Sequence, residues 1–137
     1  MRYTLFDRRK DEVLLLARVL LAALFVIFGW GKLTGFGSTV AMTTALNLPL
    51  PTIAAVVVVV MEFFVGVAIV VGFYTRPLAV LLALYTLATA FIGHHYWTLA
   101  DAERMGNMIN FYKNISIVGG LLLLGVTGPG RYSIDRR

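Results

Sequence analysis

The segment from Ile53 to Tyr74 constrains this chain more than any other part of its sequence. It holds 22 residues, and Glu62 is the single charged residue among them. An apolar run of that length can cross the hydrocarbon core of a bilayer. Glu62 would then lie near the middle of the membrane, where ionisable side chains are costly and commonly functional. The sequence therefore predicts a membrane-spanning helix that carries a buried polar site.

The rest of the chain has the composition of a membrane protein. Hydrophobic residues make up 59% of the 137 residues and charged residues 14%, against about 25% charged residues in a typical soluble domain. Four apolar runs are long enough to span a bilayer, at about 13–33, 53–74, 78–96 and 107–126. We therefore predict an all-α integral membrane protein, an antiparallel four-helix bundle that forms a single transmembrane domain over 1–137. A short interfacial helix is expected at 39–48, a tight connection at 75–77, and an aqueous or headgroup segment at 97–106.

The basic residues predict the orientation of the bundle. Four spans place both termini on one side, and most basic residues fall on that side: Arg2, Arg8, Arg9, Lys10, Arg76, Arg131, Arg136 and Arg137. By the positive-inside rule, both termini should face the cytoplasm of a bacterial inner membrane. The net charge of +5 then reflects contact with lipid headgroups, and we expect no nucleic-acid partner.

The sequence lacks the residues that several kinds of chemistry require. The chain has no cysteine, which excludes disulfides, thiolate nucleophiles and cysteine-ligated iron–sulfur clusters. His94 and His95 are adjacent, and adjacent residues on a helix point about 100° apart. We therefore predict neither a metal site nor a haem site.

Helical spacing gathers polar and small residues on one face of each span. The first span carries a stripe with a cation at each end: Arg18, Ala22, Phe25, Gly29 and Lys32. The third carries a stripe of small residues that ends at a histidine: Ala79, Ala83, Thr86, Ala90, Gly93 and His94. The fourth carries a polar face made of Asn107, Asn110, Lys113 and Asn114. Each face should turn inward, because polar groups rarely face lipid.

These faces predict a buried polar core around Glu62, which opens toward the outer half of the membrane. Depth along the helices indicates that Lys113 or Arg18 pairs with the Glu62 carboxylate, and Glu62 is expected to be ionised only if one of them contacts it. The full candidate set is Glu62, Lys113, Asn114, Arg18, His94, Asn110 and Lys32. Two simpler interpretations stay open: the charged pair only fixes the packing of the helices, and Lys32 and Arg18 only extend to the headgroup layers.

The same residues carry a family resemblance. Three segments are similar to the DoxX family of small four-span bacterial membrane proteins: Ala17–Phe36, Met61–Phe91 and Asn110–Asp135. The last is the most specific, with Lys113-Asn114, Gly119-Gly120 and the closing GPGRYSID. The resemblance implies a link to quinol oxidase or to thiosulfate-to-quinone electron transfer, with some members acting as scaffolds for other oxidoreductases.

Three functions follow as hypotheses. The first is a quinone- or lipid-interacting accessory subunit of a membrane oxidoreductase, resembling a quinol oxidase subunit without a metal or haem of its own. Its quinone head would contact Lys113, Asn114, His94 and Glu62, with the ring against Phe63 or Trp30. The second is a small transporter, which would need a homodimer because four spans are few. The third is a structural or assembly protein whose polar core only specifies packing.

Overall fold

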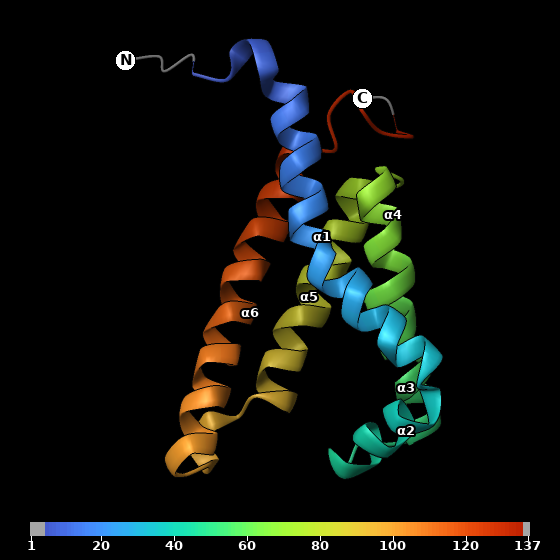
Figure 1. The fold of residues 1–137 in the computed structure, drawn as a ribbon, viewed down its shortest axis with the longest axis vertical. Coiled ribbons are helices and arrows are strands. Elements are labelled where there is room, and N and C mark those ends of the chain that lie inside the picture. Colours follow the sequence, from blue (N-terminus) through green and yellow to red (C-terminus); the bar gives the residue numbers. More distant parts are fainter. Residues whose placement is uncertain (1–4, 136–137) are drawn as a thin grey trace.

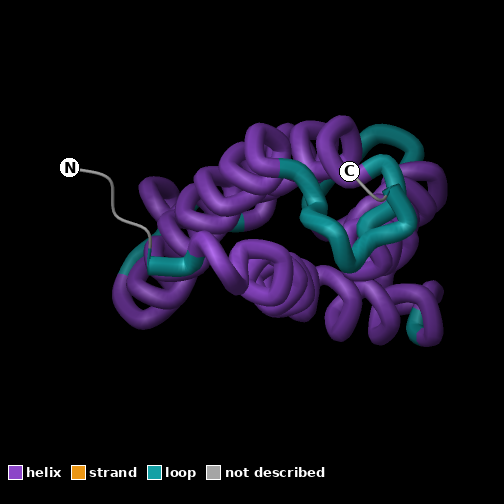
Figure 2. Tube along the Cα trace, turned by 90° about the horizontal axis from the view of Figure 1, so that it is seen from above, coloured by secondary structure: helices purple, strands orange, loops and turns teal. Residues whose placement is uncertain are grey.

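The computed structural model describes residues 5–135, and every regular element in that range is a helix (Figures 1 and 2). Six α-helices and one π-helical turn account for most of the chain: α1 (Lys10–Thr34), α2 (Phe36–Ala45), α3 (Pro51–Val59), the π turn (Val60–Phe64), α4 (Val65–Val71), α5 (Thr75–Gly93) and α6 (Asp101–Thr127). Short 3-10 turns lie at Asp7–Arg9 and Tyr96–Thr98.

Four helical segments are long and apolar enough to cross a membrane: Asp7–Thr34, Pro51–Val71, Thr75–Thr98 and Asp101–Thr127. They confirm the predicted all-helical, four-span fold. The second span is α3, the π turn and α4 joined end to end, and the break in its regular hydrogen bonding coincides with Glu62.

Two connections differ from the prediction. The fourth helix, expected from about 107, begins at Asp101, so that 101–106 of the predicted aqueous or headgroup segment is the first part of α6. The segment 75–77, expected as a turn, is the first turn of α5. The chain turns instead at Gly72 and Tyr74, which both have left-handed backbone conformations. The short helix predicted at 39–48 is present as α2, which begins three residues earlier than expected, at Phe36.

The inward faces of α1 and α5 follow the predicted stripes. The buried residues of α1 are four members of its stripe: Arg18, Ala22, Phe25 and Gly29. Those of α5 include four members of its own: Ala79, Ala83, Thr86 and Ala90. These faces meet the second span in an apolar core that also holds Val65, Ile69 and Leu121. Small residues at helical spacing let the backbones approach closely, which is the main source of packing energy inside a bilayer.

The bundle is not equally closed along its length. The start of α1 and the segment that follows α6 lie at one end, which we call the terminal end, and α2 lies at the opposite or far end (Figure 1). Helix α6 packs mainly along α5 and touches α1 much less, because α1 and α6 diverge toward the far end (Figure 1). In the most apolar 18-residue stretch of α6, only 11% is buried inside the protein, against 39% in the corresponding stretch of the second span. The predicted closed core is therefore wrong for α6: its polar face lies along α5 and toward α1, but α1 does not cover it, and Lys113 is exposed.

Candidate functional site

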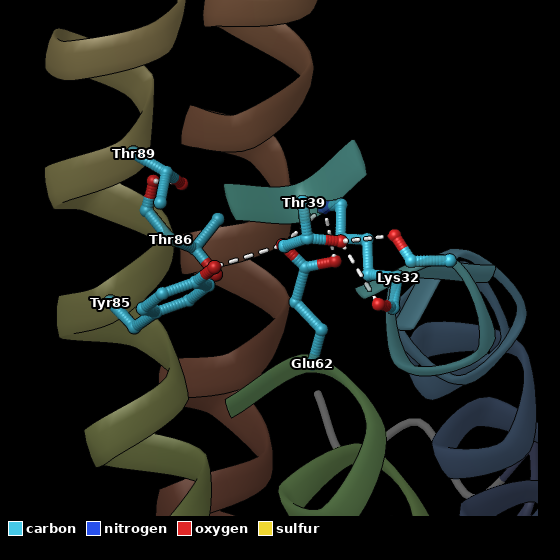
Figure 3. A network of polar contacts seen from close by, with 7 residues as sticks. Lys32, Thr39, Glu62, Tyr85, Thr86 and Thr89 are labelled. Atoms are coloured by element: carbon cyan, nitrogen blue, oxygen red, sulfur yellow. Dashed lines mark hydrogen bonds and ion pairs between the residues drawn. The ribbon is translucent and has the colours of Figure 1, made fainter. Parts of the chain in front are cut away.

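A three-residue polar cluster joins side chains of three helical segments (Figure 3). The Lys32 ammonium lies 2.7 Å from Glu62 Oε1 and 2.5 Å from Glu62 Oε2, which makes a bidentate ion pair. The Tyr85 hydroxyl donates a hydrogen bond of 2.9 Å to Glu62 Oε1. The three side chains come from α1, the π turn and α5, so the Glu62 carboxylate joins three segments of the chain.

The π turn and Gly29 place Glu62 in this position. A Cβ built on Gly29 would lie 2.5 Å from the backbone nitrogen of Phe63 and 2.8 Å from the carbonyl carbon of Glu62. No side chain fits there, so α1 and the π turn touch backbone to backbone. A π turn adds one residue to a helical turn and is frequently found at functional sites. Here it lies against the glycine of α1, one helical turn before Lys32.

The cluster is not sealed from its surroundings. The side chains of Lys32 and Glu62 keep 28% and 12% of their exposure. Phe63 follows Glu62 in the chain and packs on Trp30 of α1, with ring centroids 5.5 Å apart, and Trp30 is half-exposed. From the far-end side, Thr39 of α2 donates a hydrogen bond to the Lys32 carbonyl (Figure 3). A partly exposed ion pair can exchange hydrogen bonds with a polar group that reaches it.

Arg18 takes no part in this cluster, which corrects its predicted pairing with Glu62. Its side chain is 1% exposed. Its guanidinium donates hydrogen bonds to three backbone carbonyls, those of Val70, Pro129 and Tyr132, at 2.5–3.1 Å. Lysine could not make this fork of contacts, whereas the planar arginine head has five donors in a fixed geometry. Arg18 therefore anchors the C-terminal segment against the terminal end of the bundle.

We call residues 128–135 the C-terminal clasp. Ile134 and Asp135 donate backbone hydrogen bonds to the carbonyls of Val71 and Gly72. The Asp135 carboxylate accepts hydrogen bonds from the backbone N–H groups of Tyr74 and Thr75, at the first turn of α5. A carboxylate there also interacts favourably with the positive end of the helix dipole. Seen from above, the clasp lies over the helix ends (Figure 2).

The other predicted site residues lie apart from Glu62. Lys113 is exposed and donates a hydrogen bond of 2.9 Å to Asn110, three residues away on the same helix. His94 Nδ1 lies 3.1 Å from the side-chain oxygen of Asn107, which joins α5 to α6. Asn114 is half-buried on α6. The predicted pair between Lys113 and Glu62 is wrong, since the cation that contacts the carboxylate is Lys32.

Sequence reasoning missed Tyr85 and the π turn. Tyr85 lies in the middle of its span, eleven residues before Tyr96. A hydroxyl in that position needs a hydrogen-bond partner inside the membrane, and this signal could have selected it. No sequence signal for the π turn exists apart from Glu62 itself.

The geometry defines an integral membrane protein of the four-span class, with an ion pair held between its first and second spans. The chain belongs to the DoxX family, whose family model matches residues 13–95. That match covers most of the first three spans and includes all three residues of the Lys32–Glu62–Tyr85 cluster.

Relatives extend the similarity to the whole chain. It is 50% identical over 137 residues to the inner membrane protein YphA of Escherichia coli (strain K12), covering 98% of that protein. It is 44% identical over 130 residues to the inner membrane protein YqjF of the same strain, covering 93% of this chain and 92% of that protein. A Schizosaccharomyces pombe Surfeit locus protein 4 homolog is 31% identical over 125 residues, which cover 90% of this chain but 36% of that protein. No solved structure matches the chain. Together with the four spans, these relatives identify an inner membrane protein.

Proposed function

We propose that this protein binds the polar head of a quinone-class molecule at the Lys32–Glu62–Tyr85 cluster, as an accessory subunit of a membrane oxidoreductase system. The observation that carries the proposal is the incomplete burial of the ion pair, at 28% and 12% exposure. The half-exposed Trp30 packs on Phe63, the residue that follows Glu62. A pair that served only packing would gain nothing from this exposure, since each remaining opening lowers the strength of its electrostatic interaction.

The three side chains have matching chemistry. The Lys32 ammonium and the Tyr85 hydroxyl are hydrogen-bond donors, which a quinone carbonyl oxygen can accept. The Glu62 carboxylate is an acceptor for the hydroxyl of a quinol. A quinone that gains two electrons also gains two protons, and this cluster can give or take a proton at the quinone oxygen. The electrons would come from a cofactor of the partner oxidoreductase.

Trp30 offers a direct readout of binding. The chain has two tryptophans, so the Trp97→Phe variant leaves Trp30 as the single indole fluorophore. Trp30 follows Gly29 in α1 and packs on Phe63. Ubiquinone-1 added to this variant in nanodiscs should quench the Trp30 fluorescence along a saturating curve. Glu62→Gln should convert the curve to the linear quenching expected from partition into lipid. Saturation that is unchanged in Glu62→Gln would overturn the assignment of the site.

A structural role is the second candidate, and one observation favours it. Both Glu62 oxygens are engaged, and they join α1, the π turn and α5. If the cluster only fixes these segments, Glu62→Gln should lower the melting temperature. Ubiquinone-1 should then give no saturable quenching, with or without the Glu62→Gln substitution. The small dimeric transporter is the third candidate, and it predicts substrate flux into proteoliposomes that Glu62→Gln abolishes.

A further inference from the structure

A second polar group lies inside the membrane on α6, away from the Lys32–Glu62–Tyr85 cluster. It consists of Asn110, Lys113 and Asn114. Lys113 is twelve residues from Asp101 and fourteen from Thr127, the two ends of α6, so it lies about 20 Å from either end at 1.5 Å per residue. The hydrocarbon core is about 30 Å thick, which places Lys113 well inside it.

The charge of Lys113 is not balanced by the described part of the chain. Within residues 5–135 the ion pair is Lys32 with Glu62, and Lys113 contacts only the neutral oxygen of Asn110. In the same range the side-chain amide of Asn114 makes no hydrogen bond. Inside the membrane, a lysine and an amide whose N–H groups lack acceptors cost free energy. Such side chains are found where a polar partner or water reaches them.

Helical spacing shows which way this group faces. Residues seven positions apart on a helix point in the same direction to within about 20°. Asn114 therefore lies on the same face of α6 as Leu121, and Lys113 on the same face as Gly120. Leu121 is fully buried in the core. A Cβ on Gly120 would lie 3.2 Å from Leu21 of α1. The polar group therefore lies on the inward and α1-facing sides of α6, where α1 diverges toward the far end and leaves Lys113 exposed (Figure 1).

We propose that Lys113, with Asn110 and Asn114, binds the anionic head of a lipid-soluble acid. Its carboxylate accepts hydrogen bonds from the Lys113 ammonium and the Asn114 amide, and its hydrocarbon tail lies along the apolar surface of α6. That surface is available close by, since Ile109, Leu122 and Leu123 are exposed. A charge-assisted hydrogen bond to a carboxylate is about twice as strong as a neutral one.

Two other occupants fit less well. A symmetric second copy would bring its own Lys113 to the same depth, because a two-fold dimer in a membrane pairs equal faces, and two like charges would then meet in a medium that screens them poorly. A phospholipid keeps its phosphate in the headgroup layer, above the middle of α6. A free acid has a small head that can enter deeper.

The test compares an acid with its neutral ester. The protein in phosphatidylcholine nanodiscs is titrated with palmitate or with methyl palmitate while its melting temperature is followed. Palmitate should raise the melting temperature along a saturating curve and methyl palmitate should not. Lys113→Gln should weaken palmitate binding about tenfold or more, which corresponds to at least 1.4 kcal/mol. Lys113→Arg should keep it, and Lys10→Gln at the terminal end is the matched control.

Several outcomes would overturn the proposal. They are equal shifts with acid and ester, palmitate binding that survives Lys113→Gln, and a shift produced equally by adding phosphatidylglycerol, which would assign the group to a phospholipid. If Lys113→Gln does not fold, a photoreactive palmitate decides the matter in the unmodified protein. It should label residues 106–118 of α6, and labelling elsewhere would contradict the assignment. The quinone titration reads Glu62 through Trp30, so a failure there is distinguishable from a failure here.

Discussion

Arg18 and Glu62 are both charged side chains inside the helical bundle, and they differ in their hydrogen-bond partners and in their burial. Arg18 is 1% exposed and donates to three backbone carbonyls, two of them in the clasp. Glu62 is engaged only by side chains, from α1 and α5, and its pair with Lys32 stays partly open. Backbone acceptors cannot move without unfolding the segment that carries them, whereas side chains can exchange partners. The difference indicates that the terminal end is a fixed closure and the Glu62 cluster is the part that can respond to a ligand.

Removing the Arg18 side chain should have the largest effect on stability. Arg18→Gln leaves the carbonyls of Val70, Pro129 and Tyr132 short of donors, and each buried polar group without a partner costs about 1–3 kcal/mol. We expect a loss of about 4 kcal/mol in the free energy of unfolding, seen as a much lower melting temperature in detergent. Arg131→Gln is the control, because Arg131 lies in the clasp with an exposed side chain and uses its backbone N–H to contact Asp11.

The same variant sharpens the comparison. If Arg18→Gln retains saturable quenching of Trp30 by ubiquinone-1 at low temperature, the two regions are independent. If quenching is lost while the protein is still folded, then the closure of the terminal end controls the Glu62 cluster, and the proposed division between them is wrong.

The contact between α1 and the π turn should be nearly as sensitive. Gly29→Ala places a methyl group 2.5–2.8 Å from backbone atoms of Glu62 and Phe63. Overpacking of this kind costs about 1–3 kcal/mol and can cost more. It should also separate Lys32 from Glu62, so quinone binding and stability should fall together. Gly31→Ala is the matched control two residues along the same helix, where nothing lies within 4 Å of the new methyl group. Equal effects of the two substitutions would contradict the close contact.

Breaking the ion pair should cost less than either change. Glu62→Gln and Lys32→Gln should each lower the free energy of unfolding by about 2 kcal/mol, below the 3–5 kcal/mol of a fully buried pair, because this pair is partly exposed. The double variant should recover part of the loss, with a coupling energy of about 1–3 kcal/mol. Additive losses would mean that Lys32 and Glu62 do not interact.

The smallest effect is expected from Tyr85→Phe. It removes one hydrogen bond of 2.9 Å to Glu62 Oε1 and keeps the ring. Hydrogen bonds between membrane helices contribute about 0.6–2 kcal/mol, so we expect a loss of about 1 kcal/mol and weaker saturation by ubiquinone-1. Tyr112→Phe, whose hydroxyl contacts only that of Tyr96 at 3.3 Å, is the control and should change neither quantity.

The four spans could be predicted from the sequence because length and hydrophobicity set them directly. The buried faces of α1 and α5 followed from small residues at helical spacing, with Gly29 and Ala83 as clear examples. The pairing of charges could not be predicted in this way. Depth estimates assume regular straight helices, whereas the π turn shifts the register of the second span and α1 diverges from α6. Lys32 therefore reaches Glu62, and Lys113 does not.

Arg18 shows a second limit. Its position in the inward stripe was correct, but its partners are backbone carbonyls 52 to 114 residues away. Any residue type can supply a carbonyl, so no pattern of side chains in the sequence identifies such a partner. The clasp could have been recognised only from its glycines and its final carboxylate, which suit a tight turn and a helix N-terminus.

The central claim is that Lys32, and neither of the expected cations Lys113 and Arg18, pairs with an ionised Glu62 inside the membrane. Infrared difference spectra between the unmodified protein and Glu62→Gln, recorded in nanodiscs at neutral pH, test it directly. The ion pair predicts that the substitution removes carboxylate stretching bands from the spectrum of the unmodified protein. Loss of a protonated carbonyl band from the unmodified protein on Glu62→Gln would show that Glu62 is neutral, and would contradict the ion pair on which the proposed function rests.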